Sequence, residues 1–268
     1  MKRIIYTGNF SISWDYYKGM QGWHIKNLWA MYNYAKKHGA DFRVIDNSNN
    51  KMQWFYNECK RLTHGASDGW SIGTLASFFA LQDFVESEYD EFCWLDLDVC
   101  IKKTDTNLFN VLKKDCITIE NYVVIHDSEN PKKTFVQDFM GIGHNRWCGT
   151  GMFMMNKETA RKTLSFLEKD HMISFSHSFF MGEFIEKLIP FYKQHEGFVT
   201  DEHLMEGILN WGVVDYYTPP RKYLAKIIFP GQTADPSDDV WGFHFAGTTK
   251  NQIESFPMCI GVNGVPQS

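Results

Sequence analysis

The sequence predicts an α/β fold in which helices flank a central mixed sheet. Strand-like and helix-like segments alternate up to about residue 103, which indicates parallel strands joined by crossover helices. Beyond that point a change in this pattern indicates added strands of mixed direction. A chain of 268 residues fits one domain better than two. We therefore expect a single domain over 1–268, with halves of about 1–103 and 104–268.

The first half carries apolar runs for strands and apolar residues at helical spacing for helices. His38 and Gly39 form a plausible stop for the first helix. The predicted elements are, in chain order, a strand at 3–7, a helix over 23–37, a strand at 42–46, a helix over 71–87 and a strand at 92–101.

The second half is expected to add strands at 116–120 (CITIE) and 151–156 (GMFMMN), separated by a polar loop around 126–131. A helix over 157–169 follows the second of these strands. The aromatic-rich segment 170–200 fits neither pattern.

Two carboxylates, Asp96 and Asp98, interrupt the apolar run of the strand at 92–101. Burying two neighbouring carboxylates is costly unless a cation offsets their repulsion. On one extended strand they would share a face, because residues two apart point the same way. They stand near the carboxyl end of a predicted parallel strand, where open α/β sheets bind ligands. Their hard oxygen atoms suit Mg²⁺ or Mn²⁺ carrying a phosphorylated ligand.

Two other interpretations of this D-x-D motif compete with a metal site. Acidic pairs at this spacing are commonly solvated turn residues. The phosphatase motif D-x-D-x-T requires a hydroxyl at its fifth position, where this chain has Cys100, and it normally follows the first strand.

A second motif lies late in the chain, at WGFHFAGTTK (241–250), where His244, Gly247 and Lys250 form H-x-x-G-x-x-K. With the D-x-D motif, it resembles the glycosyltransferases of the GT-A fold, a Rossmann-like fold. The resemblance is greatest to the retaining UDP-sugar galactosyl- and glucosyltransferases of family 8, the glycogenin type, and to small viral or capsule-type transferases. On its own, His244 would more often be a core or turn histidine.

The resemblance implies a metal site and a diphosphate site. Asp98 and His244 would be direct ligands of Mn²⁺ or Mg²⁺. Asp96 would bind the metal or the ribose and donor sugar. Lys250, in the motif that contains Gly247, would hold the diphosphate of a UDP-sugar.

Two further segments resemble parts of the same family. Residues 148–162 (CGTGMFMMNKETARK) resemble a strand and helix that approach the donor sugar, where glycines permit close contact. Residues 200–212 (TDEHLMEGILNWG) resemble a helix start whose acidic residue meets the transferred sugar or the acceptor. Asp201 is the better match for this catalytic position and Glu202 the reserve. Asp201 is equally well suited to cap the helix.

The ends of the first two strands complete the expected donor site. Thr7 and Asn9 are plausible contacts to the ribose or base, and Asp46 could bind either group. The family's arginine in the helix before the D-x-D strand has no counterpart in SIGTLASFFALQDF. Another group must replace it, or the donor differs.

Composition argues against several classes of partner. A net charge of −5 without any long basic stripe argues against nucleic acid. Neither a secretory signal nor a membrane-spanning run is expected, and six cysteines without metal-binding spacing indicate a reduced cytoplasmic compartment.

The expected partners are a nucleotide-sugar donor and a glycan acceptor, and the expected reaction is hexose transfer. Two alternatives stand beside it: a metal-dependent nucleotidyl or phosphoryl transferase, and a non-catalytic sugar-binding protein on a degenerate transferase fold.

Overall fold

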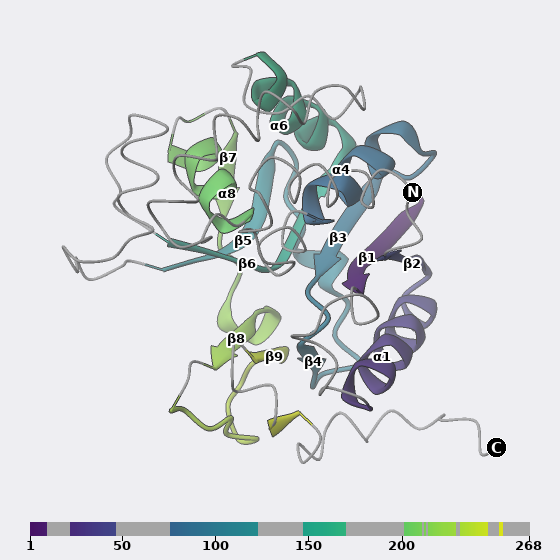
Figure 1. Ribbon diagram of the computed structural model, residues 1–268, viewed down its shortest axis with the longest axis vertical. Coiled ribbons are helices and arrows are strands. Elements are labelled where there is room, and N and C mark those ends of the chain that lie inside the picture. Colours follow the sequence, from purple (N-terminus) through teal and green to yellow (C-terminus); the bar gives the residue numbers. More distant parts are fainter. Residues whose placement is uncertain are drawn as a thin grey trace, which may run out of the picture.

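The protein is a mixed α/β structure (Figure 1), as the sequence predicts. The computed structural model describes residues 1–9, 22–46, 76–122, 147–169, 201–210, 212, 214–228, 231–245 and 252–253. The predicted polar loop at 126–131 and the segment 170–200 lie outside these residues.

The main sheet has six strands, in the spatial order β2 (Ala40–Asp46), β1 (Arg3–Asn9), β3 (Glu91–Leu95), β6 (Trp147–Asn156), β5 (Cys116–Tyr122) and β7 (Asp215–Tyr217). Strands β2, β1 and β3 are parallel. Strand β6 is antiparallel to both β3 and β5, and β7 is parallel to β5. The sheet is therefore mixed, and the carboxyl ends of β1, β2 and β3 lie along one edge.

Helices cover both faces of this sheet. On one face, α1 (Trp23–Lys37) packs its buried Met31 and Tyr34 into a core with Ile5 of β1. On the other, Phe84 of α4 (Ala76–Glu86) packs on Phe92 of β3, with ring centroids 5.3 Å apart. Two more helices, α6 (Lys157–Lys169) and α8 (Asp201–Asn210), contact β6. None of the helices within the described residues has the length and apolarity needed to cross a bilayer.

The helix predictions hold where the structure describes the chain. Helix α1 has the predicted bounds, and it ends because Gly39 adopts a positive φ of 67°. Helix α6 also has the predicted bounds, 157–169. The helix predicted over 71–87 is present as α4, and residues 71–75 lie outside the described residues.

The single strand predicted at 92–101 is wrong. Strand β3 ends at Leu95, the chain turns, and β4 (Val99–Ile101) joins a second sheet of three strands. In that sheet β9 (Gly242–Phe245) lies between β4 and β8 (Ala225–Ile228), antiparallel to β4 and parallel to β8. Figure 1 shows this small sheet beyond one edge of the main sheet. The chain changes sheets here: the Asp96 N–H still bonds to Gly151 of β6, whereas Val99–Ile101 pair with β9.

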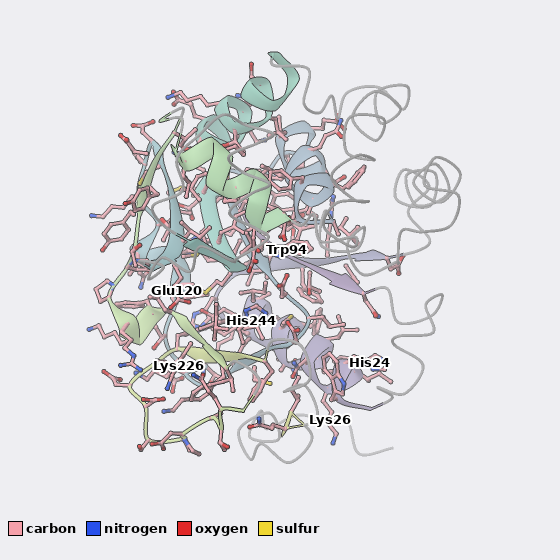
Figure 2. The ribbon with its side chains drawn as sticks, turned by 60° about the vertical axis from the view of Figure 1, so that its left-hand side comes forward. His24, Lys26, Trp94, Glu120, Lys226 and His244 are labelled. Carbon is pink, nitrogen blue, oxygen red and sulfur yellow. The ribbon has the colours of Figure 1, made fainter. Side chains whose placement is uncertain are left out.

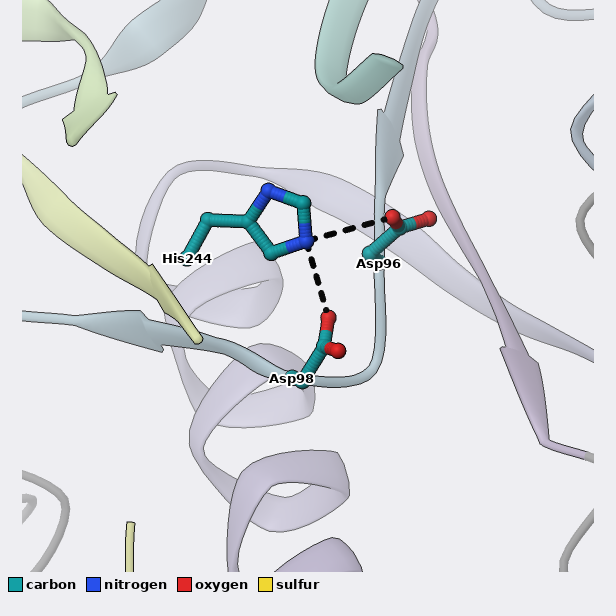
Figure 3. Close-up of side chains that lie close together, drawn as sticks. All are labelled: Asp96, Asp98 and His244. Atoms are coloured by element: carbon teal, nitrogen blue, oxygen red, sulfur yellow. Dashed lines mark ion pairs between the residues drawn. The ribbon is translucent and has the colours of Figure 1, made fainter. Parts of the chain in front are cut away.

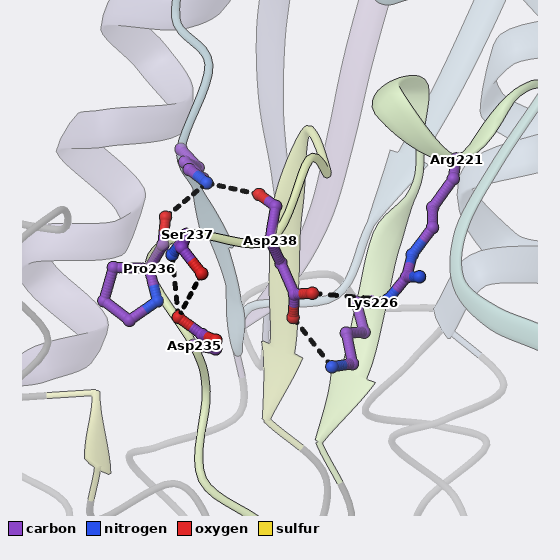
Figure 4. Close-up of polar contacts among 7 residues, drawn as sticks. Arg221, Lys226, Asp235, Pro236, Ser237 and Asp238 are labelled. Atoms are coloured by element: carbon purple, nitrogen blue, oxygen red, sulfur yellow. Dashed lines mark hydrogen bonds and ion pairs between the residues drawn. The ribbon is translucent and has the colours of Figure 1, made fainter.

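The segment that leads into β9 is fixed by side chains from the neighbouring strands (Figure 4). Lys102, directly after β4, donates hydrogen bonds to the carbonyls of Pro236 and Asp238. The Asp238 carboxylate accepts from Lys226 of β8 at 2.7 Å and lies 3.5 Å from Arg221. These contacts hold the segment before β9 against the end of β4 and against β8.

Candidate functional site

Asp96 and Asp98 lie in the turn between β3 and β4, at the carboxyl end of β3. The Val99 N–H closes this turn on the Asp96 carbonyl at 2.9 Å. The Asp96 N–H donates to the Gly151 carbonyl of β6 at 2.8 Å, and the Asp98 carbonyl accepts from the Phe245 N–H of β9 at 3.1 Å. Each aspartate is therefore tied through its backbone to a different sheet.

The imidazole of His244 points at both carboxylates (Figure 3). Its Nε2 lies 3.2 Å from Oδ1 of Asp98 and 3.5 Å from Oδ2 of Asp96. The other oxygen of Asp96 accepts from the Trp94 indole N–H at 2.7 Å. The Asp98 and His244 side chains are 9% and 11% exposed, whereas that of Asp96 is 31% exposed. The cluster is thus closed on one side and open at Asp96.

This cluster has the donor atoms and spacing of a divalent cation site. One ligand atom from each of Asp96, Asp98 and His244 lies within 4.8 Å of the other two. Two carboxylates with one imidazole suit Mn²⁺ or Mg²⁺ and leave coordination positions for other oxygen ligands. Contrary to the sequence-based prediction, Asp96 and Asp98 do not share one face of a strand, because they lie in the turn between β3 and β4. They converge on His244 because the turn joins two sheets.

Gly151 of β6 is what allows the His244 ring to take this position. A β-carbon added at Gly151 would lie 2.2 Å from Nδ1 and 2.4 Å from Cε1 of His244. Real β-carbon contacts are essentially never shorter than 3.0 Å. Gly151 thus accommodates an imidazole, and the expected approach of this segment to a donor sugar stays a prediction.

We expect Gly151→Ala to destabilise the protein by about 1–3 kcal/mol, the usual cost of overpacking a tight site. The added methyl group must displace the His244 ring, because strand β6 is held on both sides by its neighbours. Chemical denaturation of the wild type and the variant measures this change.

A double-mutant cycle with His244→Ala tests the cause of that loss. In the His244→Ala background the extra methyl group has room, so the cost of Gly151→Ala should fall by more than half. An unchanged cost in that background would show that the glycine is needed for a reason other than the imidazole.

Asp201, the first residue of α8, lies inside the protein close to this cluster. It is 3% exposed, and its carboxylate accepts from the Ser77 hydroxyl of α4 at 3.1 Å and from the Glu202 N–H at 3.0 Å. Burial, together with the negative charges of Asp96 and Glu202, raises the pKa of Asp201 well above its ordinary value, and hydrogen bonds from Ser77 and Thr150 oppose this shift. Glu202 is half-buried. Asp201 thus lies at the start of α8 and near Asp96, and both its capping role and its catalytic role stay predictions.

The predicted nucleoside contacts gather at the ends of β1 and β2. Asn9 and Asp46 are directly opposite each other in the parallel pairing of these strands. Thr7 is paired with Val44 and is fully buried. Their roles toward a nucleoside stay predictions.

Gly247 and Lys250 lie outside the described residues. Of the three residues that define the motif H-x-x-G-x-x-K, the structure therefore describes only His244.

Glu120 of β5 interacts electrostatically with His244 and belongs to neither sequence motif (Figure 2). The pairing of β5 with β6 shifts register between Ile119 and Glu120, and Glu120 lies opposite Gly149. Burial raises the pKa of Glu120 to about 7, and the charges of His244 and Arg221 act in the opposite direction. The available signal was an acidic residue at the end of the apolar run CITIE. It is the pattern that drew attention to Asp96.

The chain was compared with protein families, with curated proteins and with solved structures, and only the solved structures gave matches. No protein-family model matches it, and no curated protein matches its sequence. It is similar to a glycosyltransferase involved in glycosylation of the major capsid of PBCV-1, with 13% identity, a TM-score of 0.45 and coverage of 96% of this chain and 100% of the other.

Two further solved structures are similar. Mouse xyloside xylosyltransferase 1 has 10% identity and a TM-score of 0.49, over 92% of this chain and 98% of the other. The glycosyltransferase GlyE of Streptococcus pneumoniae TIGR4 has 12% identity and a TM-score of 0.34, over 83% of this chain and 46% of the other. All three of these solved structures are glycosyltransferases.

Proposed function

We propose that this protein is a metal-dependent glycosyltransferase that moves a hexose from a nucleotide diphosphate sugar, a UDP-sugar, to a hydroxyl group of a glycan or sugar acceptor. The observation that carries the proposal is the convergence of Asp96, Asp98 and His244 at the carboxyl end of β3. The resemblance of both motifs to family 8 supports the UDP-sugar donor and retention of configuration.

Asp96, Asp98 and His244 would hold Mn²⁺ or Mg²⁺. When bound, such an ion neutralises negative charge that develops on the diphosphate leaving group. The partly exposed side of the cluster at Asp96 is where the diphosphate would enter. The buried Trp94 indole, which donates to the Asp96 carboxylate, keeps that side chain oriented in the absence of ligand.

The remaining roles follow the order of groups along the donor. Asn9 and Asp46, at the ends of adjacent strands, would contact the nucleoside together with Thr7. Lys250, with Gly247 in its motif, would bind the diphosphate and stabilise the leaving group. Asp201, near Asp96, would face the transferred sugar or the acceptor, with Glu202 as the alternative.

The test is hydrolysis of a panel of UDP-, GDP- and dTDP-sugars with Mn²⁺, with Mg²⁺ and with EDTA, because sugar transferases commonly transfer slowly to water. We expect release of UDP from one UDP-sugar in the presence of metal and none in EDTA. Nuclear magnetic resonance of the freshly released sugar then reports whether the anomeric configuration is retained.

Three results would contradict parts of this proposal. Release of pyrophosphate from a nucleoside triphosphate would indicate a nucleotidyl transferase. Saccharide binding that persists in EDTA, without turnover of any donor, would indicate a sugar-binding protein. Release from a GDP- or dTDP-sugar alone would overturn the choice of UDP while leaving sugar transfer in place.

A further inference from the structure

Helix α1 carries one polar residue, Asn27, within the stripe of side chains that it buries against the sheets. Its neighbours on that stripe, one turn away on either side, are Trp23 and Met31. Asn27 is 1% exposed. A buried side-chain amide costs free energy unless its hydrogen-bonding groups are satisfied, so a hydrophobic residue would be expected here. The amide must have partners in the core.

Those partners belong to the turn that carries the metal-binding aspartates. The Asn27 Nδ2 donates to the Leu97 carbonyl at 2.9 Å and makes a longer contact of 3.5 Å with the Val99 carbonyl. The Cys100 thiol lies 3.6 Å from the Asn27 Oδ1, to which it donates. Leu97 and Val99 are the residues on either side of Asp98.

The amide therefore holds the turn from the side of α1, while β9 holds it from the opposite strand. The Asp98 carbonyl is bonded to the Phe245 N–H of β9. The two anchors act on consecutive peptide groups. Together they define the backbone path at Asp98, and that path brings Oδ1 of Asp98 to 3.2 Å from Nε2 of His244.

We propose that Asn27 is a positioning residue of the metal centre: by binding the carbonyls on either side of Asp98, it fixes that carboxylate within reach of His244. This inference rests on the proposed function, because it assumes that the cluster binds a divalent cation. Residues that orient metal ligands from outside the coordination sphere change metal affinity by about 10–100-fold when they are replaced.

The experiment measures Mn²⁺ affinity of the purified full-length chain by electron paramagnetic resonance of free and bound Mn²⁺. Asn27→Leu keeps the branched shape of the side chain and is well tolerated in a helix, but it removes the amide. We expect it to weaken Mn²⁺ binding by about tenfold or more. Asn27→Ser keeps a shorter hydrogen-bond donor, and its affinity should fall between those of Asn27→Leu and the wild type.

Tyr34→Phe is the matched control. Tyr34 lies on the same helix, and its hydroxyl donates to the Thr106 carbonyl at 2.6 Å and accepts from the Leu108 N–H at 3.0 Å, beyond β4 and away from the carboxylates. This variant loses the same kind of side-chain-to-backbone contact, so it should lower the unfolding temperature without changing Mn²⁺ affinity by more than about twofold.

The outcomes separate the two proposals. If the wild type and folded Asn27→Leu bind Mn²⁺ with equal affinity, Asn27 does not position the metal centre. The proposed function is then unaffected. Equal losses of affinity in Asn27→Leu and Tyr34→Phe also overturn the role of Asn27, since the effect would then be one of general stability. A wild-type protein that binds no Mn²⁺ contradicts the proposed function and the inference together.

Discussion

Replacing Asp98 with asparagine is expected to lower the rate of sugar transfer by about 10³-fold at a fixed Mn²⁺ concentration. The amide keeps the shape of the side chain but removes the negative charge of a proposed metal ligand whose side chain is 9% exposed. The same change removes repulsion between two neighbouring carboxylates. In EDTA the variant should therefore be at least as stable as the wild type.

The measurement is the initial rate of UDP release over a range of Mn²⁺ concentrations, with unfolding temperatures recorded in EDTA. Asp105→Asn is the matched control, because Asp105 is an exposed aspartate after β4 that pairs with Lys37 of α1. The control should keep at least half of the wild-type rate. Near-normal turnover in Asp98→Asn, with unchanged Mn²⁺ dependence, would remove Asp98 from the metal centre.

The helices were predictable because their signals are local. The bounds of α1 follow from apolar residues at helical spacing and from Gly39, whose positive φ ends the helix. The parallel strands β1 and β2 were predictable for a similar reason, since each is a short apolar run next to a helix. These features depend on residues close together in the sequence.

The break after Leu95 was not predictable from local sequence, because the run FCWLDLDVCI remains suited to a strand throughout. Strand β3 ends where the chain changes its pairing partner. The Asp96 N–H still bonds to Gly151 of β6, whereas β4 pairs with β9 around His244. A pattern confined to 92–101 holds no information about either partner.

The candidate site also combines features that the sequence motifs predict with features that depend on contacts between residues far apart in the sequence. Asp96, Asp98 and His244 were identified from two motifs, and the structure brings them together. Gly151 leaves space for the His244 imidazole, and this depends on the close approach of two residues that are far apart in the sequence. The position of Glu120 depends on a register shift between β5 and β6. Neither could be read from residue type and spacing.

Asp201→Asn is expected to lower the rate of sugar transfer by about 10²–10³-fold while making the metal-free protein more stable at neutral pH. Burial and the charge of Asp96 raise the pKa of Asp201 in the folded protein, whereas in the unfolded chain this carboxyl ionises near pH 4. Between these two pKa values the folded state binds more protons than the unfolded state. Stability contributed by this group is therefore lost as pH rises above about 4.

Asparagine cannot ionise, so the variant should lack this loss. Its amide oxygen can keep the hydrogen bond from Ser77, whereas its NH₂ group cannot accept from the Glu202 N–H; that loss does not vary with pH between 4 and 8. Urea denaturation in EDTA from pH 4 to pH 8 measures the free energy of unfolding of both proteins. The variant should be the more stable one, and the difference should grow as pH rises. A difference that shrinks with pH would mean that Asp201 is stabilised as a carboxylate.

Glu202→Gln distinguishes the two acidic residues at the start of α8. Glu202 is half-buried and offers its backbone N–H to Asp201, so its side chain can be changed without altering that contact. If Asp201 acts on the sugar or the acceptor, Glu202→Gln should retain most of the transfer rate and Asp201→Asn should not. The reverse pattern would assign the reaction to Glu202. In that case the role of Asp201 would be purely structural. Asp201→Asn would then gain stability without losing activity.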